Sequence, residues 1–259
     1  MIRRGGRSLD SFLPSIYAAI LDVDGTLYEG NSWVELTEGL SDPDKIESNV
    51  AIHLAAYSSF AKNEMTFDQA MKIWVDLWNG LGISEEKAEE IFEQLKPKEW
   101  AKELVHFLND WGVVCCILTG SLEEFAKVFA GTLGVSRYLA NARFNWDKRT
   151  GELVSFDYFP DQAARKHEQL SVFLEELSQG RSRAGLAGVD FDNCLVIGDG
   201  PNDYEVFKAA GLAIAIINPE KPDEGLISLA HICVDNLAEA LDALTTIRMI
   251  QVMLRYPDS

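Results

Sequence analysis

The sequence predicts an α/β protein, in which an open parallel β-sheet has helices on both faces and an all-helical cap is inserted into it. Two observations predict this fold class. Short apolar runs alternate along the 259 residues with segments of helical periodicity, which is typical of buried parallel strands joined by helices. One segment, 29–95, breaks the alternation and shows helical periodicity alone. The length allows a main domain with a substantial insertion.

Five apolar runs are short, continuous and partly β-branched, as expected of strands covered on both faces. They lie at 18–23, 113–118, 194–198, 213–217 and 231–234. Helices are expected between and after them, at 100–109, 122–133, 162–177, 203–209 and 237–246. Right-handed crossovers through such helices bring successive strands into one parallel sheet. The glycine-containing stretch 179–189 is predicted to be a loop.

The segment 29–95 is predicted to be a helical subdomain inserted after the first strand. Thr66 and Gln69 have the spacing of a capping box, and the apolar residues that follow keep helical spacing. The segment contains 4 Lys and 14 Asp or Glu, a net charge of −10. The expected organisation is therefore a core domain formed by 1–28 and 96–259, with a cap formed by 29–95.

Charge and composition exclude several classes of partner. The chain has 23 Lys and Arg against 41 Asp and Glu, a formal charge of −18, and nucleic acids or anionic membranes repel such a surface. No apolar run approaches the roughly eighteen residues needed to span a bilayer. The run at 16–21 is shorter than a signal-peptide core, so we interpret it as part of the first strand. The four cysteines lack metal or redox spacing, which favours buried thiols in a cytoplasmic protein.

Two pairs of carboxylates follow apolar runs, at the positions where open α/β sheets bind ligands. Asp22 and Asp24 come directly after the first predicted strand, and Asp199 and Asp203 follow the run that ends at 198. A solvated turn is the alternative, because Asp-Gly is a common turn dipeptide. An EF-hand is excluded because its loop glycine would fall on Leu27, and a dinucleotide-binding fingerprint is excluded because its third glycine would be Asp203.

Carboxylates this close to one another repel unless a cation is bound between them. Four acidic groups at the ends of two strands offer the hard oxygen ligands that Mg²⁺ prefers. The sequence therefore predicts a Mg²⁺ site before any family is considered.

Two further features have both a functional and a structural interpretation. Thr119, Gly120 and Ser121 follow the second apolar run and precede a predicted helix. A hydroxyl and free amides at a helix N-terminus bind anions, although a Ser or Thr there more often only caps the helix. Lys166 lies on a predicted helix, where a lysine is most often solvated.

Together these residues closely resemble the motifs of the haloacid-dehalogenase-like superfamily of phosphotransferases and phosphatases. The family pattern hhhhDxDGT is matched by Ala19-Ile20-Leu21-Asp22-Val23-Asp24-Gly25-Thr26, and its hhhT motif by Cys116-Ile117-Leu118-Thr119. Its lysine motif is matched at Lys166, and its GDGxxD motif at 198–203. The order and spacing fit across nearly the whole chain. The resemblance implies a Rossmann-like core with a helical cap, and 198–207 is most similar to the phosphoserine-phosphatase-like branch.

The resemblance implies a role for each matched residue. Asp22 is expected to be the nucleophile that forms an aspartyl-phosphate, and Asp24 the general acid and base. Mg²⁺ is expected to bind Asp22, the backbone carbonyl of Asp24, and Asp199, with Asp203 bound directly or through water. The remaining phosphate-binding groups are expected to be Thr119, Gly120 and Lys166.

The acid at position 24 favours hydrolysis of a small phosphate monoester or phosphomutase chemistry, because members of the superfamily with other activities lack an acid there. The expected enzyme is thus a Mg²⁺-dependent phosphatase acting on a small phosphorylated metabolite. A phosphomutase using the same residues is the alternative, and a non-enzymatic phosphate-sensing protein is a third. The sequence does not indicate the oligomeric state or the pathway.

The cap segment gives partial information about the substrate. It contains no arginine, since none occurs between Arg7 and Arg137, and lysine does not reproduce the bidentate grip of arginine on a carboxylate. Phosphoserine is therefore disfavoured, and the cap charge disfavours nucleotides. Glu29 is a candidate for contact with a substrate ammonium or hydroxyl. Trp74 and Trp78 are expected in the core, although the cap aromatics could also form a wall for a cationic phosphoester.

Overall fold

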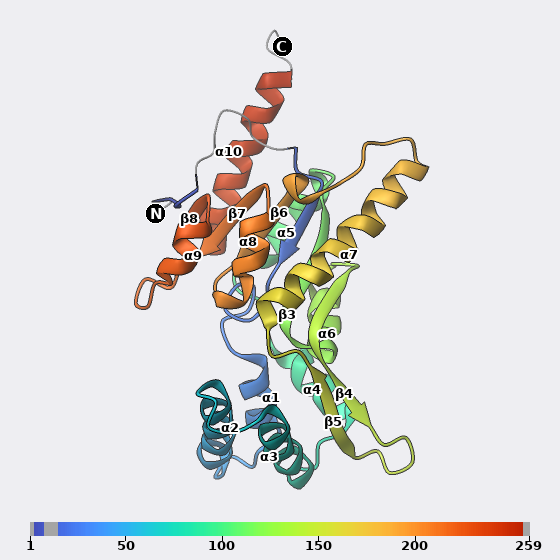
Figure 1. Ribbon diagram of the computed structural model, residues 1–259, viewed down its shortest axis with the longest axis vertical. Helices are drawn as coiled ribbons and strands as arrows, with labels where there is room; N and C mark the ends of the chain where they lie inside the picture. The colour runs from blue at the N-terminus through green and yellow to red at the C-terminus, as the bar shows by residue number, and fades with distance from the viewer. Residues whose placement is uncertain (1–2, 8–14, 256–259) are drawn as a thin grey trace.

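A single twisted sheet forms the centre of the protein, whose computed structural model describes residues 3–7 and 15–255 (Figure 1). The strand order is β1-β8-β7-β6-β2-β3-β4-β5, with β2 in the middle. The strands are β1 (Arg3–Arg4), β2 (Ala18–Leu21), β3 (Val114–Leu122), β4 (Tyr138–Trp146), β5 (Leu153–Tyr158), β6 (Cys194–Gly198), β7 (Leu212–Ile216) and β8 (Ile232–Val234). The predicted fold class, a Rossmann-like core, is confirmed, although the two edge strands β1 and β5 pair antiparallel to their neighbours.

The side chains of β2 show how the sheet separates two layers of core. Ala19 and Leu21 pack on one face, whereas Ala18 and Ile20 pack on the other, because successive side chains of a strand point to opposite faces. Helices α5 (Ala101–Asp110), α6 (Glu123–Leu133) and α10 (Leu237–Arg255) cover the first face. Helices α7 (Gln162–Arg183), α8 (Tyr204–Ala209) and α9 (Glu224–Leu229) cover the second. Because β2 is buried on both faces, its residues form a continuous apolar run in the sequence.

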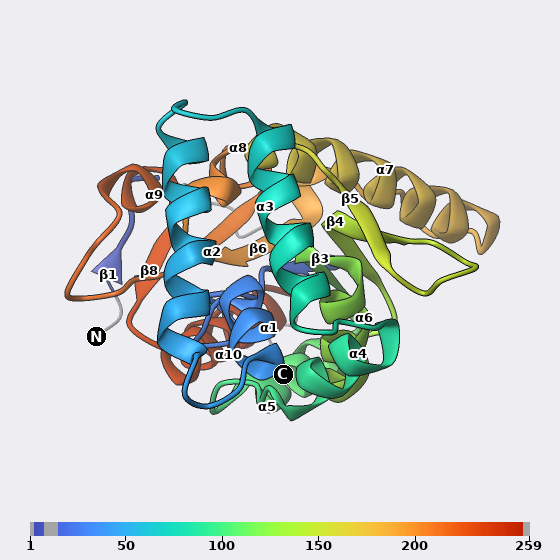
Figure 2. The same cartoon turned by 90° about the horizontal axis from the view of Figure 1, so that it is seen from below.

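Four helices lie between β2 and α5, in the segment predicted to form the cap: α1 (Ser32–Leu40), α2 (Ile46–Ala61), α3 (Phe67–Gly80) and α4 (Glu85–Gln94). The predicted capping box is present at the start of α3, where Thr66 and Gln69 satisfy each other's backbone amides. Helix α4 packs on the core helix α6. Figure 2 shows α1, α2 and α3 in front of the sheet when the molecule is viewed from below.

The long hairpin β4–β5 joins the sheet to the cap helices and was not predicted from the sequence. It extends from the edge of the sheet to α3 (Figure 1). The side-chain amide of Asn79 in α3 donates to the carbonyl of Leu153 at 2.7 Å and accepts from its amide at 3.2 Å. The turn is set by Asp147, which accepts two backbone amides, and by Gly151 at φ +75°. The hairpin therefore places β5 beside α3.

The prediction for the segment 179–189 was partly wrong. Helix α7 continues to Arg183, six residues beyond its expected end, and the chain turns only at Gly185, where φ is +71°. Arginines in the last turn stabilise the helix C-terminus, and glycine adopts the left-handed conformation that ends such helices. Within 3–7 and 15–255, no helix combines the length and hydropathy that a bilayer crossing requires.

Candidate active site

The loop after β2 holds its two aspartates in a tight turn. The amides of Thr26, Leu27 and Tyr28 all donate to the carbonyl of Val23, which folds the chain back directly beyond the strand. Gly25 has a φ of +83°, and a Cβ atom there would collide with the carboxylate of Asp199. Only glycine fits this turn without strain or a displaced neighbour.

The loop after β6 brings two more carboxylates to the same edge of the sheet. Because β2 and β6 are parallel neighbours in register, Asp22 and the loop beginning at Asp199 lie side by side. Carboxylate oxygens of Asp22, Asp199 and Asp203 lie within 4.8 Å of one another. The hydroxyl of Thr26 donates to Asp199 at 2.8 Å. These three aspartates form a cluster that has the oxygen donors and spacing for a divalent cation.

Lys166, from α7, is the counter-charge beneath this cluster. Its ammonium is fully buried and donates to Asp22 and to Asp203, both at 2.7 Å. Burial alone lowers the pKa of Lys166, but its ion pairs with Asp203 and Asp22 raise that pKa above the ordinary value. Lys166 pairs with two of the three carboxylates, so the cluster is negative when all three are ionised, which favours binding of a further cation.

The aspartates are also electrostatically strained without such a cation. Burial raises the pKa of Asp22 well above its usual range, against the opposing effect of Lys166. Burial and the neighbouring Asp203 raise the pKa of Asp199 to about 6. Both shifts express the cost of gathering carboxylates in a poorly solvated place, which a bound divalent cation removes.

Asp24 lines the same cavity as Asp22 and Asp199 and is held by the start of α1. Its carboxylate accepts the backbone amide of Ser32 at 3.1 Å and the hydroxyl of Ser32 at 2.6 Å. The hydroxyl of Ser32 is also paired with that of Ser121. Burial raises the pKa of Asp24 to about 6, although the hydrogen bonds from Ser32 oppose the rise. A carboxyl group with this pKa can give and take a proton near neutral pH.

Ser32 was missed by the sequence analysis, and Ser121 was quoted without a role. A signal for Ser32 was present, because Asn31 before it is a good helix N-cap, and its side chain accepts from Trp33 and Val34. That cap begins α1 so close to the aspartate loop that the first helical residue reaches Asp24.

Thr119 and Gly120 lie at the end of β3 and line the same cavity as Asp22. The predicted helix is present as α6, which begins at Glu123, but β3 continues to Leu122, four residues beyond its predicted end. The hydroxyl of Thr119 accepts the amide of Ser121 at 3.1 Å. The segment therefore offers a buried hydroxyl from an extended chain, and not the free amides of a helix.

A cavity of about 600 Å³ connects the carboxylates to the cap segment. Asp22, Asp24 and Asp199 lie in its lining with Thr119 and Gly120. The lining also contains seven aromatic side chains, Trp33, Tyr57, Phe60, Phe67, Trp74, Phe156 and Tyr158, and polar ones such as Asn31, Gln162 and Asn202. Trp78 is fully buried in the core as expected, whereas Trp74 is both buried and part of the cavity wall. Glu29 does not line the cavity; its exposed carboxylate pairs with Lys98 at 3.0 Å.

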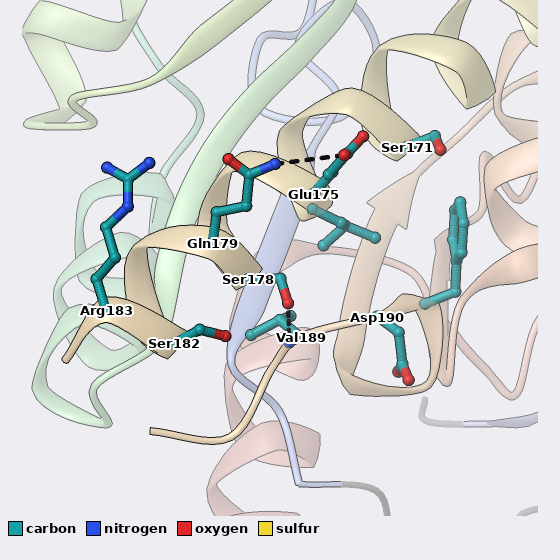
Figure 3. Close-up of a pocket in the computed structure, with 10 residues that line it drawn as sticks. Ser171, Glu175, Ser178, Gln179, Ser182, Arg183, Val189 and Asp190 are labelled. Atoms are coloured by element: carbon teal, nitrogen blue, oxygen red, sulfur yellow. Dashed lines mark hydrogen bonds between the residues drawn. The ribbon is translucent and has the colours of Figure 1, made fainter. Parts of the chain in front are cut away.

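A second cavity, of about 560 Å³, lies beside the C-terminal half of α7 (Figure 3). Its labelled side chains include Ser178, Gln179 and Arg183, and Figure 3 shows Gln179 bonded to Glu175 within the same helix. None of the aspartates described above lines this cavity, so the candidate active site is the aromatic cavity at the strand ends.

Comparisons with known proteins agree with this placement. The model of the haloacid dehalogenase-like hydrolase family matches residues 16–211. Phosphoserine phosphatase from Methanocaldococcus jannaschii is 27% identical over 60% of this chain and 66% of that protein. The enzyme of the same name from Archaeoglobus fulgidus is 26% identical over 76% of this chain and 51% of that protein. The chain thus spans about half to two thirds of the length of these two relatives.

A structural likeness covers most of the chain. The solved structure of a phospho-aspartyl intermediate analogue of phosphoserine phosphatase superposes with a TM-score of 0.62, covering 88% of this chain and 99% of that one at 21% identity. A solved hydrolase from Salmonella enterica serovar Typhi superposes with a TM-score of 0.64 at 15% identity, covering 86% of this chain and 68% of that one. These likenesses show a shared fold.

Proposed function

Because this chain belongs to the haloacid dehalogenase-like hydrolase family, we propose that it is a Mg²⁺-dependent phosphatase that hydrolyses a small phosphate monoester through an aspartyl-phosphate. One observation carries the proposal: Asp22, Asp199 and Asp203 cluster together, Lys166 pairs with Asp22 and Asp203, and Asp22 and Asp199 line a cavity that Asp24 also lines. The names of the relatives, phosphoserine phosphatases, support the same class of reaction.

Asp22 is the proposed nucleophile, and Lys166 holds its carboxylate in place through the bond at 2.7 Å. Attack on phosphorus forms the acyl-phosphate bond and breaks the bond to the alcohol oxygen. Asp24 gives the departing alcohol a proton and then takes one from the water that hydrolyses the intermediate. Its pKa of about 6 and its two bonds to Ser32 suit a group that changes protonation state at a fixed position.

The transferring phosphoryl group is proposed to bind Thr119 and Gly120, which line the cavity beside Asp22, and to be neutralised in part by Lys166. A carboxylate that approaches a phosphate at about 4 Å is repelled by roughly 4 kcal/mol per charge pair at an effective dielectric constant near 20. The residues proposed to hold Mg²⁺ are Asp22, Asp199 and Asp203 with the backbone of Asp24. The ion, when bound, supplies the positive charge that offsets this repulsion.

The arrangement favours hydrolysis over the phosphomutase alternative. Leu54 and Tyr57 line the cavity and are about half exposed, at 46% and 51%, so solvent reaches its mouth. A mutase must exclude water from the aspartyl-phosphate, whereas a phosphatase must admit it. The division into a core, 1–28 and 96–259, and a cap, 29–95, is part of the same proposal, as is a small phosphorylated metabolite as substrate.

The test is phosphate release from a panel of phosphate monoesters, with Mg²⁺ and with a chelator. Release is expected with Mg²⁺ only. Asp22→Asn is the matched control, because it removes the nucleophile at constant shape; it is expected to abolish turnover while circular dichroism and the melting curve show a folded protein. A folded Asp22→Asn protein that keeps more than a few per cent of the rate contradicts the nucleophile assignment. Absence of release from every ester contradicts the phosphatase function.

A further inference from the structure

We infer that the alcohol half of the natural substrate is apolar, an aromatic or alkyl group without a second anion. The inference rests on the phosphatase function proposed above and adds the substrate class. It comes from the lining of one cavity, in which Asp22 and Asp24 lie at the reacting end and seven aromatic rings form the largest group of side chains elsewhere. A volume of about 600 Å³ is within the range of roughly 300–1,000 Å³ that small-molecule sites occupy. Phosphate alone would leave most of it empty.

The aromatic wall is built from several elements that brace one another. Trp33 from α1 lies 5.3 Å from Phe156 of β5 and 6.4 Å from Trp74 of α3, measured between ring centroids. Phe67 of α3 stacks on Tyr158 of β5 at 5.0 Å. Because these rings already pack together, the wall is formed before a ligand arrives. A preformed apolar wall binds an apolar group with little further loss of entropy.

The described part of the wall offers no cationic side chain for a second anion. Among the described residues that line the cavity there is no Lys or Arg, and His53 is neutral at pH 7 because burial lowers its pKa to about 4. Lys166 is already bonded to two aspartates, and Lys98 to the carbonyl of Gly25 at 2.6 Å and to Glu29. A substrate carboxylate or second phosphate would be desolvated without a partner, which is costly.

A cationic alcohol is the nearest rival, because aromatic faces attract cations. The carboxylates of the cavity do not favour it. Apart from the three at the reacting end, the lining contains only Asp161 among the described residues, and this side chain already caps α7 by accepting the amide of Ala164 at 3.0 Å. The apolar lining instead continues outward to Leu54 and Tyr57 at the mouth. This continuity fits a ring or an alkyl chain better than a compact ammonium group.

The first test is a comparison of substrates at fixed Mg²⁺ concentration. Ethyl, butyl and hexyl phosphate have nearly the same leaving group, so their kcat/KM values report contact with the distal cavity. We expect a rise of about two- to fourfold per methylene, and values for benzyl phosphate at least about tenfold above those for phosphocholine and phosphoserine. A flat series, or a preference for phosphocholine or phosphoserine, overturns the inference.

The second test changes the wall itself. Leu54→Lys places a cation at the cavity mouth, and Ile52→Lys places the same group two residues away on α2, at a side chain that is equally exposed (47%) and outside the lining. Leu54→Lys is expected to lower kcat/KM for hexyl phosphate about tenfold and to raise the relative rate with phosphoserine, while Ile52→Lys leaves both as in the parent protein. Equal behaviour of the two variants contradicts the inference.

Binding of butyl- and hexylphosphonate, measured by calorimetry, separates failure of this inference from failure of the proposed function. If the phosphonates bind more strongly as the chain lengthens and no ester releases phosphate, the apolar substrate site is supported and the phosphatase function is contradicted. If phosphate is released at rates that do not depend on chain length, the phosphatase function is supported and the apolar substrate class is contradicted. If no phosphonate binds and no ester releases phosphate, both the apolar cavity and the phosphatase function are contradicted.

Discussion

Replacing Lys166 by methionine tests the electrostatic design of the site without relying on turnover. The ammonium of Lys166 is fully buried and makes two ion pairs, with Asp22 and with Asp203, both at 2.7 Å. Methionine fills nearly the same space with an uncharged chain, so packing is largely kept. What changes is that two buried carboxylates lose their shared cation.

The expected cost follows from that burial. Removing one partner of a buried ion pair destabilises a protein by about 3–5 kcal/mol, because the other charge is left uncompensated. Lys127 offers the matched control, since its pair with Glu89 joins side chains that are 61% and 45% exposed. Exposed pairs contribute only about 0–1 kcal/mol. Lys127→Met is therefore expected to change the free energy of unfolding little, and Lys166→Met by several times more.

Urea unfolding at pH 7.5, with and without Mg²⁺, measures both variants. The loss in Lys166→Met is expected to shrink when Mg²⁺ is present, because a bound cation stabilises the folded state and neutralises the same aspartates. Adding Asp22→Asn to Lys166→Met is expected to recover part of the loss by removing one uncompensated charge. Similar small losses in Lys166→Met and Lys127→Met, with no effect of Mg²⁺, would refute this reasoning.

Three further outcomes are expected. Asp199→Asn should raise the Mg²⁺ concentration for half-maximal phosphate release at least about tenfold; an unchanged requirement contradicts its ligand role. Gly25→Ala should also raise that Mg²⁺ requirement, because the added Cβ at a φ of +83° would displace the carboxylate of Asp199. Gly151 is the control, since it has a φ of +75° with open space around it, and Gly151→Ala should cost only backbone strain of about 1 kcal/mol. Equal Mg²⁺ requirements in the two variants argue against the clash. His53 stays neutral in the folded state because burial lowers its pKa to about 4, while the unfolded chain takes up a proton below about 6.5. Because only the unfolded chain takes up this proton, the free energy of unfolding falls by up to about 3 kcal/mol as the pH falls from 6.5 to 4. In urea unfolding measured across this pH range, His53→Gln is expected to reduce the dependence of the free energy of unfolding on pH. An unchanged dependence contradicts this role of His53.

The part of the fold that the sequence predicted well is the part encoded locally. A strand such as β2, buried on both faces, appears as a continuous apolar run, and the aspartates that follow it belong to a contiguous motif. Parallel pairing in register then determines that Asp22 meets the loop of Asp199, even though 177 positions separate them. The rule that strand ends share one edge of the sheet was enough to place them together.

The hairpin β4–β5 escaped prediction because the search was for continuous apolar runs. Strand β4 alternates instead, with Tyr138, Ala140, Ala142, Phe144 and Trp146 on one side. Alternation is the pattern of a strand with one exposed face, and the turn signal from Asp147 to Gly151 follows it. The alternation in β4 indicates a strand, but only continuous apolar runs were taken to indicate strands.

Other features arise only from tertiary packing. The position of Lys166 was expected only through the family resemblance, because helical periodicity alone does not show that α7 brings this lysine to Asp22 and Asp203. The aromatic wall is similar, because Phe156 and Trp33 come from segments more than a hundred residues apart. Such contacts depend on how the hairpin meets the helices, which local periodicity does not encode.

Three consecutive residues connect the reacting end of the cavity to its aromatic wall. Ser32 donates twice to Asp24, Asn31 begins α1 by capping it, and Trp33 packs against Phe156 in the wall. Because all three lie at the rigid first turn of one helix, a displacement of α1 moves the partners of Asp24 and the ring of Trp33 together. The same turn of helix thus positions the aromatic ring that contacts the substrate's alcohol half and the carboxyl group of Asp24 that protonates the alcohol oxygen. Contacts between the substrate and the wall, far from phosphorus, therefore affect the geometry of proton transfer.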